Sequence, residues 1–205
     1  MDSLHKLVEL FRQFPGIGPR QARRFVYFLL TKDQSFLDEL AELGITLKKE
    51  IAPCIRCFRH VPKNVSSLCN ICRDKNRDKT MLALVAKDID LEAIERSSSF
   101  NGRYFVLGGT IPMLEKKNQG HVRQSELLVL VESEAKTEGL KEILLGLSAN
   151  PEGEYTADRI KEALAPLVAK HKLSVTTLGR GLSTGSELEY ADSETIKSAL
   201  KNRAA

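Results

Sequence analysis

Four cysteines constrain this chain more than any other feature of its sequence. Cys54 and Cys57 form one C-x-x-C pair, Cys69 and Cys72 form a second, and eleven residues separate the two pairs. Each pair can present two thiolates from one tight turn, and two such turns complete a tetrahedron of four sulfurs around Zn²⁺. The chain has 4 cysteines in all, so this ligand set uses every one. The spacing therefore predicts one structural zinc ion per chain.

Other interpretations of the cysteines stay open. Two disulfides or unrelated buried thiols would also use them, although disulfides are rare in a reducing cytosol. A thioredoxin-like redox site would need only one C-x-x-C. His60 could replace one thiolate, but we expect it at the surface. Residues 54–79 hold seven Lys and Arg and few large apolar side chains, so metal binding would supply folding free energy that packing cannot.

The length and composition are those of a folded protein. The chain has 205 residues, of which 42% are hydrophobic and 28% are charged, a balance unlike that of disordered chains. Apolar runs such as 25–30 and 127–131 are far shorter than the ~18 residues that cross a bilayer. Residues 1–5 lack the pattern of a signal peptide. We therefore expect a cytoplasmic protein that makes no membrane contact.

Charge is unevenly distributed along the chain. Residues 1–80 hold 15 Lys and Arg against 9 Asp and Glu, a net charge of +6, whereas residues 81–205 carry −2. A basic segment attracts polyanions, which points to nucleic acid as a partner of the first part. A basic face that is merely solvated would give the same composition.

The first fifty residues predict three helices and one tight turn. Two prolines and two glycines over 14–19 exclude a helix there. Before and after this turn, apolar residues recur at helical spacing, as they do again over 35–51. Ser35 and Asp38 have the spacing of a capping box for the third helix. The three apolar stripes are Leu4, Leu7, Val8 and Phe11; Ala22, Phe25, Val26, Leu29 and Leu30; and Leu37, Leu40, Leu43, Leu47 and Ile51.

The turn between the first two helices resembles a helix-hairpin-helix element, which binds DNA without reading its sequence. Gly16 and Gly18 would let the backbone approach a phosphate, and the amides that start the next helix would point at it. Arg20, Arg23 and Arg24 follow at once and add charge without base specificity. The alternative is a hairpin used only for packing, for example in a dimer.

Beyond the cysteines, strand and helix patterns alternate. Apolar segments predict strands over 81–85, 104–107, 141–147 and 173–177, and helices are predicted over 90–96, 156–170 and 192–201. Residues 127–131 are ambiguous, and the charged residues that follow them favour a helix. Alternation of this kind indicates an α/β domain in which helices cover a parallel sheet.

Five motifs, taken in this order, resemble the RecR family of bacterial recombination mediator proteins over essentially the whole chain. They are FPGIGP at 14–19, CRDKNRD at 72–78, GRYFVLGG at 102–109, EGEYT at 152–156 and RGLSTGSELEYAD at 180–192. The resemblance implies a helix-hairpin-helix region for DNA binding and oligomerisation at 1–52, a four-cysteine zinc finger at 53–79, a Toprim-type domain at 80–178, and a C-terminal motif with a helix at 179–205.

The same resemblance implies a role in DNA repair by recombination. Family members act as non-catalytic clamps and adaptors that, with RecO and RecF, promote loading of RecA onto single strands coated by SSB. They form dimers, which can close into a ring tetramer around DNA. The basic residues that face DNA in the family map onto Arg20 and Arg24, with Arg23 beside them.

The chain also departs from the family pattern. Ala86 stands where relatives place a glutamate, residues 110–124 lack the usual Gly-Ile-Gly-Pro, and Ser183, Thr184 and Ser186 replace Pro, Val and Gly. These departures bear on whether contacts with RecO and RecF carry over.

An enzyme remains the runner-up interpretation. On an extended segment Glu152 and Glu154 would share a face and could hold Mg²⁺ in a Toprim-type nuclease or primase. Ala86 cannot supply the further carboxylate, and the chain lacks a P-loop motif. We therefore expect a non-enzymatic adaptor, in which this acidic pair binds a basic partner or forms a solvated rim.

Overall fold

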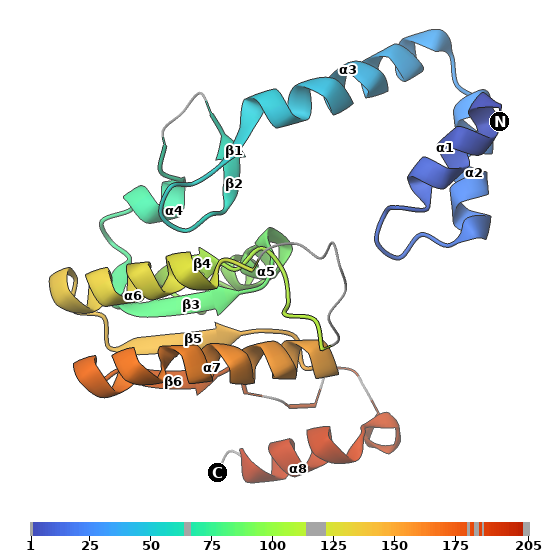
Figure 1. Cartoon of the computed structure of the whole chain (residues 1–205). Coiled ribbons are helices and arrows are strands. Elements are labelled where there is room, and N and C mark those ends of the chain that lie inside the picture. The colour runs from blue at the N-terminus through green and yellow to red at the C-terminus, as the bar shows by residue number, and fades with distance from the viewer. Residues whose placement is uncertain are drawn as a thin grey trace. The chain divides into compact units, whose positions relative to one another are not determined.

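The computed structural model describes residues 2–63, 67–113, 122–179, 181–182, 185 and 187–202. It divides into two compact units, Met1–Ala52 and Pro53–Ala205 (Figure 1). None of the helices described is long and apolar enough to cross a membrane.

The first unit contains helices α1 (Ser3–Phe11), α2 (Pro19–Leu30) and α3 (Gln34–Glu50). Apolar residues of α1 and α2 form its small core: Val8, Ala22 and Val26 are buried, and Leu4, Phe11 and Ile17 pack against them. The helical spacing read from the sequence is therefore correct for all three helices.

The predicted capping box of α3 is wrong. Asp33, one residue before the helix, is its N-cap, and the Asp33 carboxylate accepts a hydrogen bond from the Phe36 amide at 3.0 Å. Asp33 has the extended backbone that an N-cap requires, whereas Ser35 already lies inside the helix and donates its hydroxyl to Asp33. The helix ends at Glu50, and Ile51 begins a strand instead of extending the apolar stripe.

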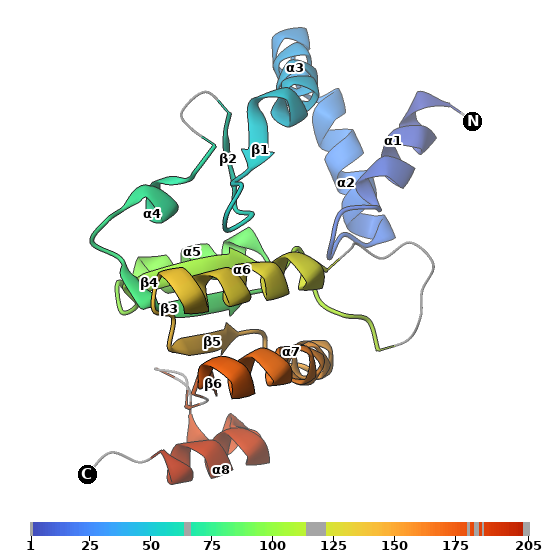
Figure 2. The ribbon, with the colours of Figure 1, turned by 60° about the vertical axis from the view of Figure 1, so that its left-hand side comes forward.

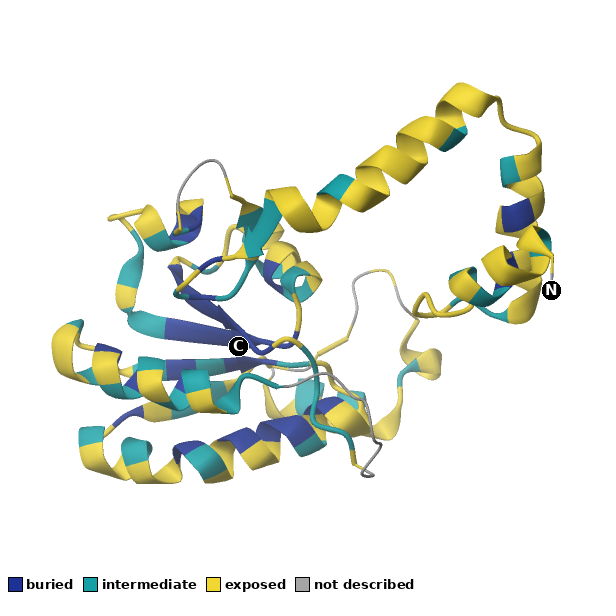
Figure 3. Cartoon of the chain, turned by 45° about the horizontal axis from the view of Figure 1, so that its top comes forward, coloured by how far each residue is buried: buried dark blue, intermediate teal, exposed yellow. Residues whose placement is uncertain are grey.

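The apolar stripe of α3 is not buried. No residue of this helix is buried, and Leu43 and Leu47 are 59% and 61% exposed. Figure 3 shows the helix as almost continuously exposed. The stripe therefore makes α3 amphipathic, but it contributes no buried residue to a core.

The second unit begins with the cysteine segment. Strands β1 (Ile51–Pro53) and β2 (His60–Pro62) pair in a two-stranded sheet, and the short helix α4 (Asn70–Arg73) follows. The main sheet contains β3 (Asp78–Val85), β4 (Gly102–Val106), β5 (Glu142–Gly146) and β6 (Ser174–Thr177), in the order β4-β3-β5-β6. All three pairings are parallel, as the sequence predicted.

Helices cover both faces of the main sheet, as Figures 1 and 2 show. On one face, α6 (Gln124–Thr137) and α7 (Pro151–His171) pack on Leu82 and Leu84 of β3. On the other, α5 (Asp88–Ser97) packs on Ala83 and Val85 together with the cysteine segment. Alternate residues of one strand thus serve two separate apolar layers.

The start of α7 differs most from the prediction. The helix begins at Pro151 and not near 156, because the Asn150 side chain accepts a hydrogen bond from the Gly153 amide at 2.8 Å and Pro151 occupies the first turn. The ambiguous segment 127–131 lies inside α6, as its flanking charges favoured.

The chain ends with a short 3₁₀ helix, η1 (Leu188–Tyr190), and with α8 (Ser193–Lys201), which Asp192 caps. Ser183, Thr184 and Ser186, together with most of the 110–124 departure, lie outside the described residues.

Candidate metal centre and nucleic-acid interface

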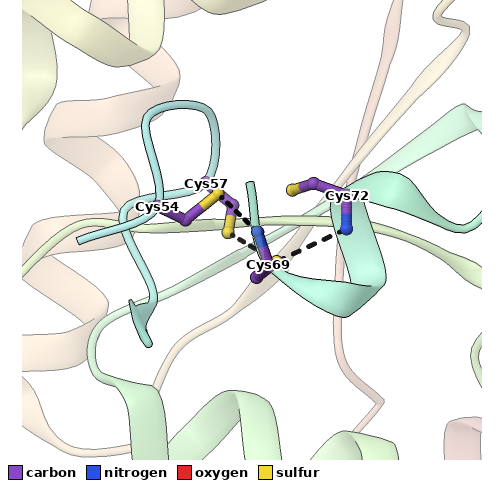
Figure 4. A group of neighbouring side chains, drawn as sticks. All are labelled: Cys54, Cys57, Cys69 and Cys72. Carbon is purple, nitrogen blue, oxygen red and sulfur yellow. Dashed lines mark hydrogen bonds between the residues drawn. The ribbon is translucent and has the colours of Figure 1, made fainter. Parts of the chain in front are cut away.

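The four cysteines come together at one point. Cys54 directly follows β1, Cys57 lies in the next turn, Cys69 caps α4 and Cys72 belongs to it. Their Sγ atoms all lie within 4.8 Å of one another, and those of Cys57 and Cys69 are 3.5 Å apart (Figure 4). Among the residues that the structure describes, no other group of three or more His, Cys, Asp or Glu gathers in this way.

The arrangement fits a tetrahedral metal ion. Sulfurs bound at about 2.3 Å to one Zn²⁺ lie about 3.8 Å apart, which is close to the separations in this cluster. Backbone amides also point at the sulfurs: Cys69 N lies 3.3 Å from Cys54 Sγ, and Cys72 N lies 3.4 Å from Cys69 Sγ. Phe58 adopts a left-handed φ of 61° after the first pair and closes that turn. The four cysteines could therefore hold a metal ion.

The thiols of Cys57, Cys69 and Cys72 affect one another's ionisation. Hydrogen bonds from the Cys57 and Cys72 thiols lower the pKa of Cys69 below its ordinary value. The hydrogen bond with Cys69 and burial raise the pKa of Cys57 well above its ordinary value. Further thiolates in this buried space would repel the first, and a bound cation would compensate that charge.

The disulfide and His60 alternatives do not agree with the structure. All four cysteines are free, and none forms a disulfide. His60 is exposed, as expected, and lies away from the sulfurs: its Nδ1 is 2.9 Å from a carboxylate oxygen of Asp88, and its amide donates to the same carboxylate at 2.8 Å. His60 thus ties β2 to the start of α5 and is not a ligand.

The cysteine segment covers one edge of the main sheet. The Val106 amide of edge strand β4 donates to the Cys57 carbonyl at 2.8 Å. The rings of Phe58 and Phe105 are 5.3 Å apart in an edge-to-face contact, and the Arg123 guanidinium lies 5.2 Å from the Phe58 ring. An edge strand that would otherwise expose its backbone is therefore covered at this point by the segment that carries the candidate metal ligands.

The hairpin has the predicted shape. Gly16 has a left-handed φ of 77°, which favours glycine, and Gly18 is the N-cap of α2 with extended backbone. A Cβ at either glycine would meet nothing within 4 Å, and Gly16 is exposed while Gly18 is half-buried. Pro19 occupies the first turn of α2, and the Gln21 side chain accepts from the Gly18 amide at 3.3 Å.

The three arginines that follow are exposed on α2. Within the part of the chain that the structure describes, Arg20, Arg23 and Arg24 form no ion pair, and the first turn of α2 holds no acidic residue. Arg20 and Arg24 are four residues apart and so lie on one face of the helix. The positive charge here is not compensated locally, which suits a phosphate-binding surface.

The predicted acidic pair of the second unit, Glu152 and Glu154, is not arranged as expected. Glu152 and Glu154 both lie in the first turn of α7 instead of on an extended segment, so they project about 200° apart around the helix axis. Thr110 donates to Glu152 at 3.4 Å. Glu154 instead lines a cleft of about 330 Å³ together with Asp158 and Lys161. The sequence interpretation did not group Asp158 with Glu154, because its helix began near Thr156 and left Glu154 on an extended segment.

Ala86 closes the end of β3. It is only 4% exposed, and its carbonyl accepts a hydrogen bond from the Gly108 amide at 2.9 Å. The position where a further carboxylate would stand is thus filled by a buried methyl group.

Comparison with known proteins agrees with this architecture. The model of the RecR helix-hairpin-helix matches residues 4–43, that of the Toprim domain matches 81–179, and that of the RecR C-terminal region matches 181–204. A recombination protein RecR of Chloroflexus aggregans is 39% identical over 198 residues, which cover 97% of this chain and 91% of that protein. The chain belongs to the RecR family.

Other RecR proteins are similar over nearly the whole chain. The protein of Roseiflexus castenholzii is 38% identical over 97% of this chain and 91% of its own, and that of Legionella pneumophila is 36% identical over 100% and 98%. The resemblance read from the five motifs is confirmed, and so is the fold class that it implied.

Proposed function

We propose that this RecR family member is a non-catalytic DNA-binding clamp and adaptor in recombinational repair. Membership of a family of recombination proteins supports the general role. The observation that carries the DNA-binding part is the hairpin of the first unit, where exposed Arg20, Arg23 and Arg24 follow the open backbone of Gly16 and Gly18. A helix N-terminus with adjacent cations binds phosphates and reads no bases.

The proposed role involves no catalysis. Mg²⁺-dependent phosphoryl chemistry needs several convergent oxygen ligands. Here Ala86 contributes none, and Glu152 and Glu154 diverge around α7. A surface role for this acidic pair, in contact with a basic partner protein, fits their exposure better than a metal site does.

We propose zinc as the metal of the four-cysteine centre, one ion per chain, with Cys54, Cys57, Cys69 and Cys72 as ligands. A closed set of four thiolates selects a soft or borderline cation and leaves no position for a substrate, so the role is structural. The free energy of metal binding would stabilise a segment that has few apolar side chains of its own.

The partners of the first unit follow from its surface. Its helices expose large apolar residues, among them Phe25, Phe28, Leu43 and Leu47, and a second copy of the chain would bury them. We propose a homodimer that can close into a ring tetramer, acting with RecO and RecF to promote RecA loading on SSB-coated single strands. We propose that residues 1–52 form the region for DNA binding and oligomerisation and that residues 53–79 form the zinc finger. Residues 80–178 would form the Toprim domain, and residues 179–205 the C-terminal motif with its helix.

Fluorescence anisotropy with labelled DNA over a salt series tests the DNA-binding part. The double substitution Arg20→Ala and Arg24→Ala should weaken binding at every sequence. It should also flatten the plot of log K against log salt by ~0.9 for each duplex phosphate that the protein no longer neutralises. Arg12→Ala is the matched control, because Arg12 is an exposed arginine of the same unit that is already paired with Glu9 at 2.8 Å.

An unchanged salt slope in the double variant would reject the hairpin as the DNA-binding surface. If sedimentation of the same variant showed an altered mass together with that unchanged slope, the hairpin would be an element of subunit packing only.

A further inference from the structure

Arg56 lies between the two ligands of the first C-x-x-C pair and reaches across to the second. Its Nη1 is 3.5 Å from Cys72 Sγ, and its Nη2 pairs with the Glu134 carboxylate of α6. The side chains of Arg56 and Glu134 are only 15% and 5% exposed. One buried guanidinium therefore contacts both a sulfur of the metal centre and a helix 78 residues further along the chain.

Glu134 depends on this contact. It lies on the inward side of α6, where its second carboxylate oxygen is buried and has no hydrogen-bond partner among the described residues. Arg103 is the other cation nearby, but its closest approach to Glu134 is 3.9 Å, and its Nε is also buried without a partner in the part of the chain described. Removing Arg56 would thus leave a buried carboxylate with little compensation, which is strongly destabilising.

Arg56 also compensates the charge of the metal centre. Four thiolates around a divalent ion carry a net charge of −2, and a guanidinium that donates to one sulfur compensates part of it. Groups that contact the ligands of a metal commonly orient them and tune their affinity. Among the described residues, Arg56 is the one cation whose side chain donates a hydrogen bond to a cysteine sulfur.

We infer that Arg56 is a positioning residue that couples metal occupancy of the four-cysteine centre to the packing of α6 on the main sheet. With the metal bound, the Cys72 thiolate and Glu134 hold the guanidinium between them. When the metal leaves, the turn that carries Arg56 loosens, and Glu134 loses its main counter-charge. The coupling reaches α6 through the Arg56 guanidinium, which contacts Cys72 and Glu134.

The inference rests on the proposed metal centre, so the first measurement is the affinity of the full-length wild-type chain for Zn²⁺, by competition with a chromophoric chelator. No zinc binding by the wild-type chain would reject the metal centre itself. With binding established, Arg56→Met should lower the affinity by about 10–100-fold. Arg56→Lys should lose less zinc affinity, because lysine keeps the positive charge.

Arg73→Met is the matched control. Arg73 directly follows Cys72 and is exposed, so this variant removes the same charge next to a ligand without touching Glu134. Its affinity should stay within twofold of wild type. Equal losses in Arg56→Met and Arg73→Met, or an Arg56→Met affinity within twofold of wild type, would overturn the inference.

Hydrogen exchange of the full-length chain separates coupling from a local structural role. In the wild type, chelation of the metal should accelerate exchange of α6 amides around Glu134 by more than about tenfold. In Arg56→Met, α6 should exchange at the same rate with and without metal. Metal-independent exchange of α6 in the wild type would show that no coupling exists.

Arg56→Met alone could fail to fold, because it leaves Glu134 unpaired. The double variant Arg56→Met with Glu134→Leu removes both buried charges, which such sites often tolerate. The same two measurements then apply: its zinc affinity should be reduced, and its α6 exchange should not respond to chelation. A wild-type response in this double variant would reject Arg56 as the connection.

Discussion

The two units of this chain use apolar residues in opposite ways. In the second, successive residues of parallel strands are completely buried on both faces of the sheet, as Leu82 and Ala83 of β3 are. In the first, only Val8, Ala22 and Val26 are buried among the residues described, and most of the leucines and phenylalanines remain at the surface. Apolar residues at helical spacing lie in the core in α6 and α7 of the second unit, whereas in α3 of the first unit none is buried. An apolar stripe therefore predicts a helix, and its neighbours decide whether the stripe is buried.

The second unit adds the four-cysteine cluster, the proposed metal centre, to a core that is already closed. Its cysteine segment is fixed to the sheet by the Cys57 carbonyl, to α5 by His60 and to α6 by Arg56. The first unit has no comparable set of long-range polar contacts among the residues described. We expect changes at the metal centre to have the largest effects on stability, and changes in the first unit to affect binding more than folding.

Loss of a metal ligand is the largest effect that we predict. Cys54→Ser or Cys72→Ser should abolish tight zinc binding and, with it, a contribution of roughly 10 kcal/mol to the folding of the cysteine segment. The protein should become insoluble or sensitive to proteases, and elemental analysis should fall from about one Zn²⁺ per chain to none. Metal-free wild-type protein that is fully folded and resistant to proteolysis would contradict this.

Glycine-to-alanine substitutions should have opposite effects in the two units. A Cβ at Gly153 would lie 2.0 Å from the Ser148 carbonyl oxygen, so Gly153→Ala should destabilise the start of α7 by roughly 1–3 kcal/mol or more. A Cβ at Gly44 of α3 would meet nothing within 4 Å, so Gly44→Ala should stabilise that helix by up to about 1 kcal/mol.

Urea-dependent hydrogen exchange, read separately for α7 and α3 peptides, checks both substitutions in one experiment. Effects of the same sign in the two helices would mean that the contrast between a packed and an open unit is wrong.

Acid should affect the second unit through Glu95. Hydrogen bonds from Arg77, at 2.5 and 2.7 Å, lower the pKa of Glu95, and the Tyr104 hydroxyl donates to the same carboxylate at 2.7 Å. Because the pKa is lower in the folded state, this contribution is complete above the ordinary value of 4.5 and is lost as the pH falls below it.

The corresponding measurement is the stability of the full-length chain by urea unfolding between neutral pH and about pH 3. Glu95→Gln should reduce stability at neutral pH and make it less dependent on pH in the acid range. Glu9→Gln in the first unit should change little, since the Glu9–Arg12 pair is exposed. An unchanged acid response in Glu95→Gln would assign the effect to other carboxylates.

Much of this architecture could be predicted because its signals are local. The C-x-x-C spacing predicted the cysteine cluster, and the glycines and prolines of 14–19 predicted the hairpin. The start of α7 was missed although Asn150 and Pro151 are a common N-cap and first-turn pair, because the segment was interpreted as extended. The Arg56–Glu134 pair could not be predicted, since its members are 78 residues apart and each looks like a surface charge in the sequence.

The smallest effect that we predict is that of Mg²⁺ on DNA. Incubation of the protein with Mg²⁺ and supercoiled or single-stranded DNA should leave the DNA intact. Octahedral Mg²⁺ needs several oxygen ligands in one place. Glu154 and Asp158 are four residues apart on α7 and line one cleft, but Glu152 projects away from them and Ala86 is a buried methyl group.

The substitutions Glu154→Gln and Asp158→Asn should accordingly leave the DNA intact and change the affinity for DNA by no more than about twofold, because we assign DNA binding to the arginines of the first unit. Reproducible nicking that Glu154→Gln abolishes would place catalysis in the second unit. It would also show that a pair of carboxylates one helical turn apart recruits its remaining metal ligands from the DNA itself, since phosphate oxygens can complete the coordination of Mg²⁺. Intact DNA in every reaction would agree with the proposed division of labour, in which the first unit binds the nucleic acid and the second supplies a stable body around the proposed metal centre.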